Sequence, residues 1–113
     1  MADLKSRRRA RRLADERNLA GFANDTKWGE FFQQVESLRI PVEVKLLYED
    51  EPTRAARMWI PVPNYLESVH GPELYVFIEW VRSADSDHVS RIATIVGLEF
   101  SVEHGKVTVY GYK

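Results

Sequence analysis

One stretch near the middle of the chain, residues 74–82, reads LYVFIEWVR and decides the fold. Its apolar side chains fall on both alternating faces of an extended strand. One face has Leu74, Val76, Ile78 and Trp80, and the other has Tyr75, Phe77 and Val81. Apolar residues on both faces are typical of a strand that is covered on both sides, or on one side by a partner. We therefore expect residues 74–82 to be the central strand of a sheet.

The same two-residue period appears on either side of this stretch. Residues 42–48 alternate apolar with charged side chains and predict a strand with one solvated face. Residues 57–62 predict a second strand, placed at an edge because Pro61 lacks the ladder donor. We expect a loop at residues 64–72, with a short helical turn at 65–68. Residues 98–103 and 107–112 flank the turn His104-Gly105 and predict an antiparallel hairpin.

Three segments have helical character. Residues 25–39 place five apolar side chains at a 3.6-residue spacing: Trp28, Phe31, Phe32, Val35 and Leu38. Asp25 or Thr26 is the expected cap, and Pro41 stops the helix. Residues 85–97 predict a short amphipathic helix that ends at Gly97. Residues 3–19 are helix formers with a thin apolar stripe, so we expect helicity from about residue 8 after a frayed start.

These elements together predict the fold class α+β. Two N-terminal helices precede the order βββαββ, which gives an antiparallel four- to five-stranded sheet with helices on one face. The chain has 113 residues, so we expect a single domain over residues 1–113, with residues 1–15 as a basic N-terminal arm. The strand order does not follow from the sequence.

Composition excludes several classes of protein. Hydrophobic residues make up 44% and charged residues 29% of the chain, as in soluble globular proteins. No apolar run reaches the roughly 20 residues of a membrane helix, and no apolar segment follows the basic start as in a secretory signal. The absence of cysteine excludes disulfides and thiolate nucleophiles. We expect a cytoplasmic protein.

The net charge of −1 hides an asymmetry between the two ends of the chain. Residues 1–20 contain seven basic and three acidic residues, and the other 93 residues contain nine basic and fourteen acidic ones. The basic excess comes mainly from Arg7, Arg8, Arg9, Arg11 and Arg12. Such a cluster attracts phosphates, although no aromatic residue lies among the arginines to stack on bases. The alternatives are a solvated helix or an arm that folds back on the acidic body.

One phrase within the chain resembles a known group of proteins. Glu16-Arg17-Asn18-Leu19 is followed by Asn24-Asp25-Thr26-Lys27-Trp28-Gly29-Glu30, and the chain closes on Tyr110-Gly111-Tyr112. These segments resemble a family of short, uncharacterised bacterial proteins with an E-R-N-L stretch, an N-(N/D)-T-K-W-x-E segment and a terminal Y-G-Y. The resemblance covers most of the chain from residue 16 on. It implies a bacterial cytosolic protein of one domain and no established activity.

The sequence nominates no catalytic or metal site. His70, His88 and His104 lie too far apart for a helical metal site, and no nucleotide-binding or hydrolase motif is present. Asp50 with Glu51, or Asp85 with Asp87, has the chemistry for a cation or an acid/base pair, but adjacent loop carboxylates are usually solvated. We therefore predict neither a cofactor nor a metal, and no enzymatic activity.

A binding role is the remaining interpretation. Tyr110 and Tyr112 alternate away from Val107 and Val109, Trp59 shares a strand face with Arg57, and Tyr65 lies in the predicted loop. If the second face of the sheet is uncovered, these aromatic residues form an exposed patch whose acidic rim includes Glu49, Asp50 and Glu51. An apolar patch with a polar rim is typical of a protein-binding surface. The first hypothesis is a small protein-binding module, of the immunity type that inhibits a cognate toxin. The second is a nucleic-acid-associated protein that uses the basic arm, and the third is an enzyme with an unrecognised pocket. The structural alternative to the exposed patch is a second layer, in which the first helix covers that face of the sheet.

Overall fold

The computed structural model describes residues 3–57, 65–68 and 71–113. Three helices are present in this part: α1 (Leu4–Glu16), α2 (Asp25–Ser37) and α3 (Ser86–Val96). The strands are β1 (Glu43–Leu46), β2 (Tyr65–Ser68), β3 (Gly71–Leu74), β4 (Ile78–Ser83), β5 (Phe100–Glu103) and β6 (Lys106–Tyr110), with a 3-10 turn, η1 (Tyr75–Phe77), before β4. The α+β class predicted from the sequence is confirmed.

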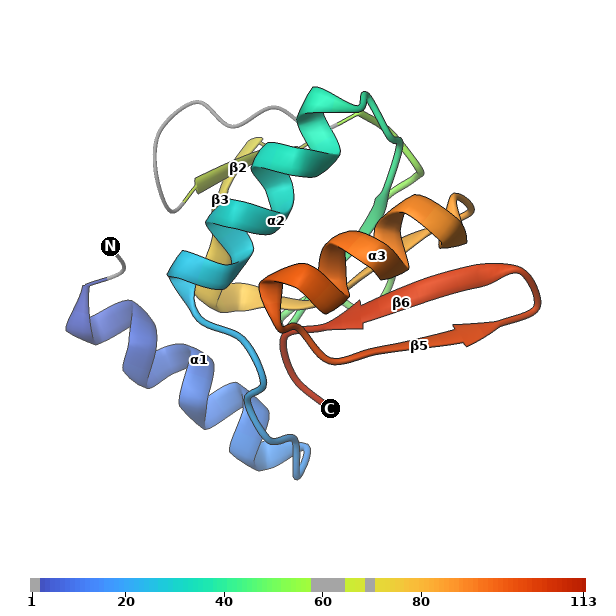
Figure 1. Ribbon diagram of the computed structural model, residues 1–113. Helices are drawn as coiled ribbons and strands as arrows, with labels where there is room; N and C mark the ends of the chain where they lie inside the picture. The colour runs from blue at the N-terminus through green and yellow to red at the C-terminus, as the bar shows by residue number, and fades with distance from the viewer. Residues whose placement is uncertain (1–2, 58–64, 69–70) are drawn as a thin grey trace.

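The main sheet has four strands in the order β1-β4-β6-β5, and every neighbouring pair is antiparallel. β4 is therefore internal, as its apolar sequence predicts. Figure 1 shows α2 and α3 side by side over one face of this sheet. β2 and β3 form a separate antiparallel hairpin. α1 packs against η1, away from the α2–α3 pair.

Each helix begins at a side-chain cap that satisfies a free backbone N–H. Asp3 accepts from the N–H of Ser6 at 2.7 Å, so α1 begins at Leu4 and the frayed start expected before residue 8 is wrong. Asn24 accepts from the N–H of Lys27 at 2.8 Å, so the cap of α2 is Asn24 and not Asp25 or Thr26. Gly97, with φ of 87°, ends α3 in the left-handed conformation that glycine adopts without strain.

The predicted central strand at residues 74–82 is divided by the 3-10 turn η1. Tyr75 and Phe77 are both buried there, and their rings pack against Phe32 and Tyr48 at centroid distances of 5.4 and 5.5 Å. A straight strand would send these two rings and Ile78 to opposite faces. The turn lets all three side chains enter the core, so the predicted alternation over the whole stretch is wrong.

A β-bulge in β4 changes the alternation once more. Lys45 pairs with Trp80 while its neighbour Leu46 pairs with Ile78, so Glu79 is the extra residue of β4. Ile78 and Val81 consequently both reach the core, and each is 0% exposed. The bulge also frees the Glu79 carbonyl, which accepts from the N–H groups of Gly111 and Tyr112.

Two further predictions concern the segment between β1 and β4. Tyr65–Ser68 is a strand, not the loop or helical turn expected from the sequence, because it pairs with Gly71–Leu74. The strand predicted at residues 57–62 lies almost wholly outside the described residues. Just before it, Ala56 forms an isolated bridge with Val42, which places the chain beside the free edge of β1.

The core lies between the α2–α3 layer and the sheet. The rings of Trp28, Phe31 and Phe32 pack on one another at 5.3–5.6 Å. Valines from four elements meet them, and all are nearly inaccessible: Val35, Val44, Val81, Val107 and Val109. Leu38, expected in the same stripe, is 50% exposed because α2 ends at Ser37 and Leu38 is its C-cap.

Candidate functional site

The face of the main sheet turned away from α2 and α3 is here called the outer face. Along β1, β4 and β6 its residues alternate with buried valines, as the pleat requires. It includes Glu43 and Lys45 from β1, Trp80 and Arg82 from β4, Ser101 and Glu103 from β5, and Lys106, Thr108 and Tyr110 from β6. The outer face therefore combines aromatic side chains with charges of both signs on adjacent strands.

Trp80 and Tyr110 are cross-strand partners on the outer face, at the end of the β4–β6 pairing that lies next to Glu79. The Arg82 guanidinium lies over the Trp80 ring at 4.2 Å and donates from Nε to Thr108 Oγ1 at 3.0 Å. The Lys113 ammonium lies over the Tyr110 ring at 5.0 Å. The Tyr110 hydroxyl is 2.9 Å from Ser101 Oγ. These contacts hold the aromatic pair in place, and both residues remain partly exposed.

One end of the outer face is closed by an ion cluster around Glu79. The carboxylate accepts from Arg17 Nη1 at 2.5 Å and from Lys45 Nζ at 3.1 Å. The side chains of Glu79 and Lys45 are each 9% exposed, whereas that of Arg17 is 46% exposed. Burial raises the pKa of Glu79, but the hydrogen bonds from Arg17 and Lys45 outweigh burial and hold the pKa below its usual range. Glu79 is therefore a carboxylate that ties α1 to the sheet.

The other end of the outer face opens into a hollow of about 570 Å³. Arg82 belongs to both, and Glu43, Asp85 and Lys106 add charges of both signs to the wall of the hollow. These side chains come from β4, from β1, from the α3 cap and from β6. The hollow has room for a side chain of a binding partner and offers it ionic or hydrogen-bonding groups.

The residues predicted to bind a partner are found in different settings. Glu49, Asp50 and Glu51 are exposed in the loop after β1, as expected. Tyr110 lies on the outer face. Trp59 lies outside the described residues, and Tyr65 begins β2 but its side chain is not described. Among the described residues, no hydrogen bond or ion pair joins the acidic loop to Tyr110.

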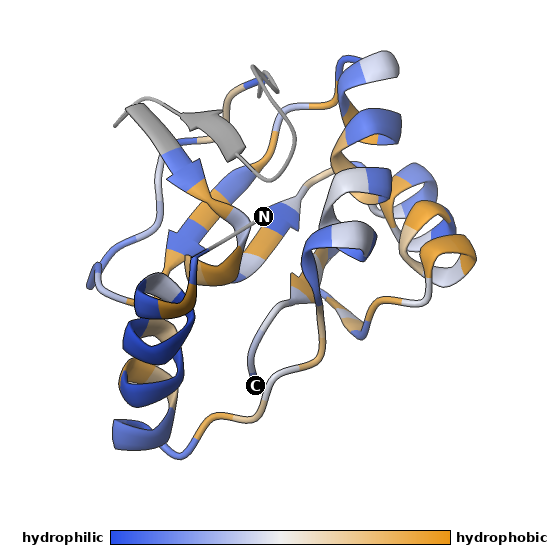
Figure 2. Cartoon of the chain, turned by 90° about the vertical axis from the view of Figure 1, so that its left-hand side faces the viewer, coloured by the Kyte–Doolittle hydropathy of each residue, from blue (hydrophilic) through white to orange (hydrophobic). Residues whose placement is uncertain are grey.

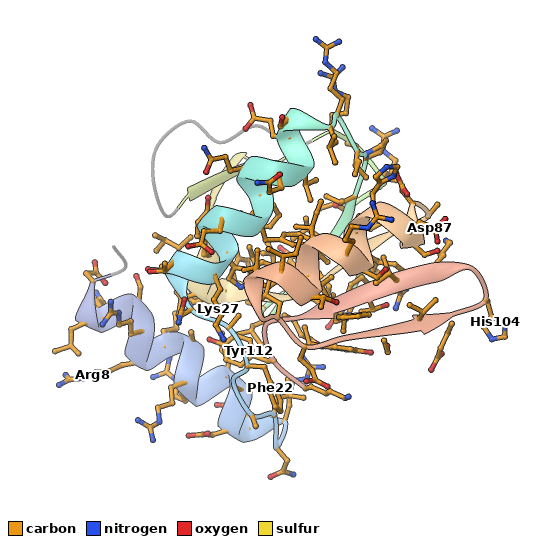
Figure 3. The ribbon with its side chains drawn as sticks, viewed as in Figure 1. Arg8, Phe22, Lys27, Asp87, His104 and Tyr112 are labelled. Carbon is orange, nitrogen blue, oxygen red and sulfur yellow. The ribbon has the colours of Figure 1, made fainter. Side chains whose placement is uncertain are left out.

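Tyr112 is a structural residue and not part of a patch. Its hydroxyl donates to the carbonyl oxygen of Val76 at 2.7 Å, and its backbone bridges to Gly21 (Figure 3). Burial raises the pKa of Tyr112. The terminal Y-G-Y segment therefore fastens the end of the chain between the α1–α2 connection and η1.

The N-x-T-K-W segment also has a structural place. Asn24 caps α2, Trp28 is buried in the core, and Lys27 Nζ donates to the carbonyl oxygen of Gly97 at 3.0 Å. That carbonyl belongs to the residue that ends α3, so Lys27 joins the first turn of α2 to the end of α3. The segment positions the two helices that cover the sheet.

The five arginines of the predicted basic arm, Arg7, Arg8, Arg9, Arg11 and Arg12, are ordered on α1 and exposed. The buried side of the helix is made by Ala10 and Ala14. Figure 2 shows α1 as a strongly hydrophilic helix. No helix in the described part of the chain is long and apolar enough to cross a membrane.

Histidine and acidic side chains do not gather into a metal site within the described residues. His88 Nδ1 lies 2.9 Å from Asp85 at the start of α3, and His104 lies at the tip of the β5–β6 hairpin (Figure 3). His70 lies outside the described residues. Across residues 3–57, 65–68 and 71–113, no group of three histidine or acidic side chains is placed to hold a metal ion.

Sequence reasoning missed the outer-face residue Trp80 and the Glu79 cluster. Trp80 was predicted to lie in a strand with apolar neighbours, and only the bulge turns it outward. One feature of the sequence indicates the cluster: Glu79 is the single charged residue between Leu74 and Val81. A lone charge inside an apolar strand needs a partner, but its partners are 62 and 34 residues away.

Comparison with known proteins gives lineage alone. No curated protein and no solved structure matches the chain. One family model matches residues 10–91, from the middle of α1 to α3. The match includes the capped Asn24–Trp28 segment, the bulged strand β4 and the Glu79 cluster. The chain therefore belongs to the family of unknown function DUF6678.

Proposed function

We propose that the protein is a binding module that recognises another protein through its outer face. The observation that carries the proposal is the cross-strand pair Trp80 and Tyr110, each with a cation over its ring. Trp, Tyr and Arg are the residues that most often dominate the energy of protein interfaces. Their rotamers are fixed before binding, so little conformational entropy is lost on association.

The kind of partner that we propose is a toxin, with this protein as its immunity-type inhibitor. Asp50 of the acidic loop is near enough to Arg17 for its charge to help raise the pKa of Arg17, after the larger effect of the hydrogen bond with Glu79. An acidic rim speeds encounter with basic proteins, and toxins that cleave nucleic acids have basic clefts. An inhibitor needs no catalytic group of its own.

The proposal is tested by affinity capture from the organism that encodes the chain. The wild-type protein, the double variant Trp80→Ser/Tyr110→Ser and the control Ile95→Ser are used as bait. Ile95 is 78% exposed on α3, on the opposite side of the sheet. We expect one stoichiometric protein with the wild type and the control, and its loss with the double variant, whose fold is verified by circular dichroism.

Growth assays then test the immunity role. The captured protein should arrest growth when expressed alone, and co-expression of the wild-type chain should restore growth. If the wild type captures no stoichiometric protein, or if the control variant loses it equally, the outer face is not the binding surface. A captured protein that does not arrest growth would leave protein binding in place and refute inhibition of a toxin.

A further inference from the structure

The charges on α1 run against the helix dipole. The first turns carry Lys5, Arg7 and Arg8, and the last turn carries Asp15 and Glu16. The helix has no acidic residue in its first turn and no basic residue in its last. A helix is stabilised by the reverse arrangement, because its N-terminal end is the positive pole. Lys5, Arg7 and Arg8 therefore gain no stabilisation from the helix dipole, and they add to the positive potential at the start of α1.

Two basic residues dock α1 on the protein. The Arg9 guanidinium lies over the Tyr48 and Phe77 rings at 5.2 and 5.4 Å. Arg17 binds Glu79. Together with the buried Ala10 and Ala14 these contacts fix the helix on η1. Figure 3 shows Arg8, in contrast, pointing away from the strands.

The remaining arginines are left for a ligand. Arg7, Arg8, Arg11 and Arg12 are exposed, and none forms an ion pair with a described residue. Arg8 and Arg12 lie one turn apart on the side opposite Ala10 and Ala14. With Leu4, Lys5 and Arg9 they line a concave surface of about 500 Å³. This basic surface is positioned by a rigid, docked helix.

We propose that this surface of α1 binds the phosphodiester backbone of nucleic acid, with Lys5, Arg8 and Arg12 as the contact residues. Guanidinium groups form paired hydrogen bonds with phosphate oxygens. α1 has no aromatic residue to stack on a base, so the contacts are with phosphates and carry no sequence preference. The proposal is independent of the outer face and of its partner.

An anionic membrane is a poorer fit to this surface than nucleic acid. A helix that lies in a lipid interface turns an apolar face to the acyl chains. The apolar side of α1, Ala10 and Ala14, is already buried against the protein, and Leu4 is the one apolar residue that lines the basic surface. Nothing apolar of adequate area remains for lipid.

The test is fluorescence anisotropy of labelled 20-base-pair DNA and of 20-nucleotide single-stranded RNA, titrated with the full chain. Three phosphate contacts predict a slope near −2.7 for log K against log salt on duplex DNA, or about a 40-fold loss of affinity between 50 and 200 mM salt. Comparison of the two probes tells which nucleic acid is preferred. Vesicles of phosphatidylserine and phosphatidylcholine are the third ligand.

The decisive variant is Arg8→Ala/Arg12→Ala, and its matched control is Arg54→Ala/Arg57→Ala. Both pairs are exposed, and both variants lose two positive charges. We expect the α1 variant to bind at least tenfold more weakly at 50 mM salt, with a slope near −0.9, and the control to stay close to the wild type. Alanine favours a helix, so the α1 variant should fold at least as stably.

Three results would overturn the proposal. The first is no binding of either nucleic acid at 50 mM salt. The second is an equal loss of affinity in the two variants, which would mean that net charge and not the α1 surface determines binding. The third is binding to the anionic vesicles at concentrations where neither nucleic acid binds, which would assign the surface to lipid headgroups.

Discussion

Substitution of Glu79 by glutamine tests whether the ion cluster at the end of the outer face stabilises the fold. Glu79→Gln removes the negative charge and keeps the size of the side chain. It leaves Lys45, whose side chain is 9% exposed, without its carboxylate partner. Arg17 also loses its partner but is 46% exposed, so water can solvate it. The loss of stability caused by the substitution therefore comes mainly from leaving the buried Lys45 ammonium without its carboxylate.

The magnitude follows from what Lys45 retains. Removing one partner of a buried ion pair typically destabilises a protein by about 3–5 kcal/mol. Lys45 Nζ still donates to the carbonyl oxygen of Leu46 at 2.7 Å, and the glutamine oxygen is a second acceptor. The half-exposed pair with Arg17 contributes no more than about 1 kcal/mol. We expect Glu79→Gln to lower the free energy of unfolding by about 2–3 kcal/mol at pH 7.

The pH dependence of stability provides a second test of the same ion cluster. Because the pKa of Glu79 is lowered in the folded state, its stabilisation is complete above the unfolded pKa of about 4.3. It is lost as the pH falls through the folded pKa. The difference in stability between wild type and Glu79→Gln should therefore be largest near pH 7 and shrink below about pH 4.

The assay is urea unfolding followed by circular dichroism and tryptophan fluorescence at pH 7, 5 and 3.5. Glu99→Gln is the control, since Glu99 and Lys113 are 3.8 Å apart and about half-exposed, and it should cost less than about 0.5 kcal/mol. Equal stability of Glu79→Gln and wild type at pH 7, or a difference that does not change with pH, would refute the reasoning.

Three further substitutions test the packing and capping of the fold, each by urea unfolding. Gly111→Ala places a methyl group 2.2 Å from the Ile78 carbonyl oxygen and should lower the free energy of unfolding by at least about 2 kcal/mol. The control Gly105→Ala, in open space at φ of 77°, should lower it by only about 1 kcal/mol. Similar losses of stability in the two variants would contradict the close approach at Gly111. Tyr75→Phe should raise the free energy of unfolding by about 1 kcal/mol, because the buried hydroxyl has no hydrogen-bond partner among the described residues. Burial also raises the pKa of Tyr75 to about 12. A clear loss of stability in this variant would mean that the hydroxyl forms a hydrogen bond. Asn24→Ala should cost about 1 kcal/mol through the lost cap of α2, and an unchanged stability would contradict the role of that side chain.

Local sequence patterns predicted those helices and strands along which the spacing of apolar residues stays constant. The apolar stripe from Trp28 to Val35 predicts α2, and His104-Gly105 predicts the β5–β6 hairpin. In both cases the information lies within a few residues, where helix periodicity or turn geometry acts directly. The class and the internal position of the strand Ile78–Ser83 followed from these elements and from its apolar sequence.

The 3-10 turn and the bulge could not be predicted in the same way. Residues 74–82 alternate without a glycine or proline, so nothing local marks the break at Tyr75–Phe77. The break exists because two large rings must reach Phe32 and Tyr48, residues that are distant in sequence. The candidate site depends on the second irregularity, the β-bulge. The bulge at Glu79 turns Trp80 to the outer face and the Glu79 carboxylate toward Lys45. The outer face is therefore set by tertiary packing.

The basic residues at the start of the sequence fall into two groups in the structure: some dock α1 on the protein, and the others are exposed. If α1 served only to fold back on an acidic body, its cations would be paired with acidic side chains. Arg17 follows that expectation with Glu79, and Arg9 docks on aromatic rings instead. Arg7, Arg8, Arg11 and Arg12 have no ion pair among the described residues, and Arg7 and Arg8 lie near the start of the helix, where its dipole disfavours a cation. A folded-back arm accounts for Arg9 and Arg17, whereas the four exposed arginines distinguish the other two interpretations. A merely solvated helix predicts that Arg8→Ala/Arg12→Ala leaves nucleic-acid binding unchanged, and the proposed phosphate contact predicts its loss.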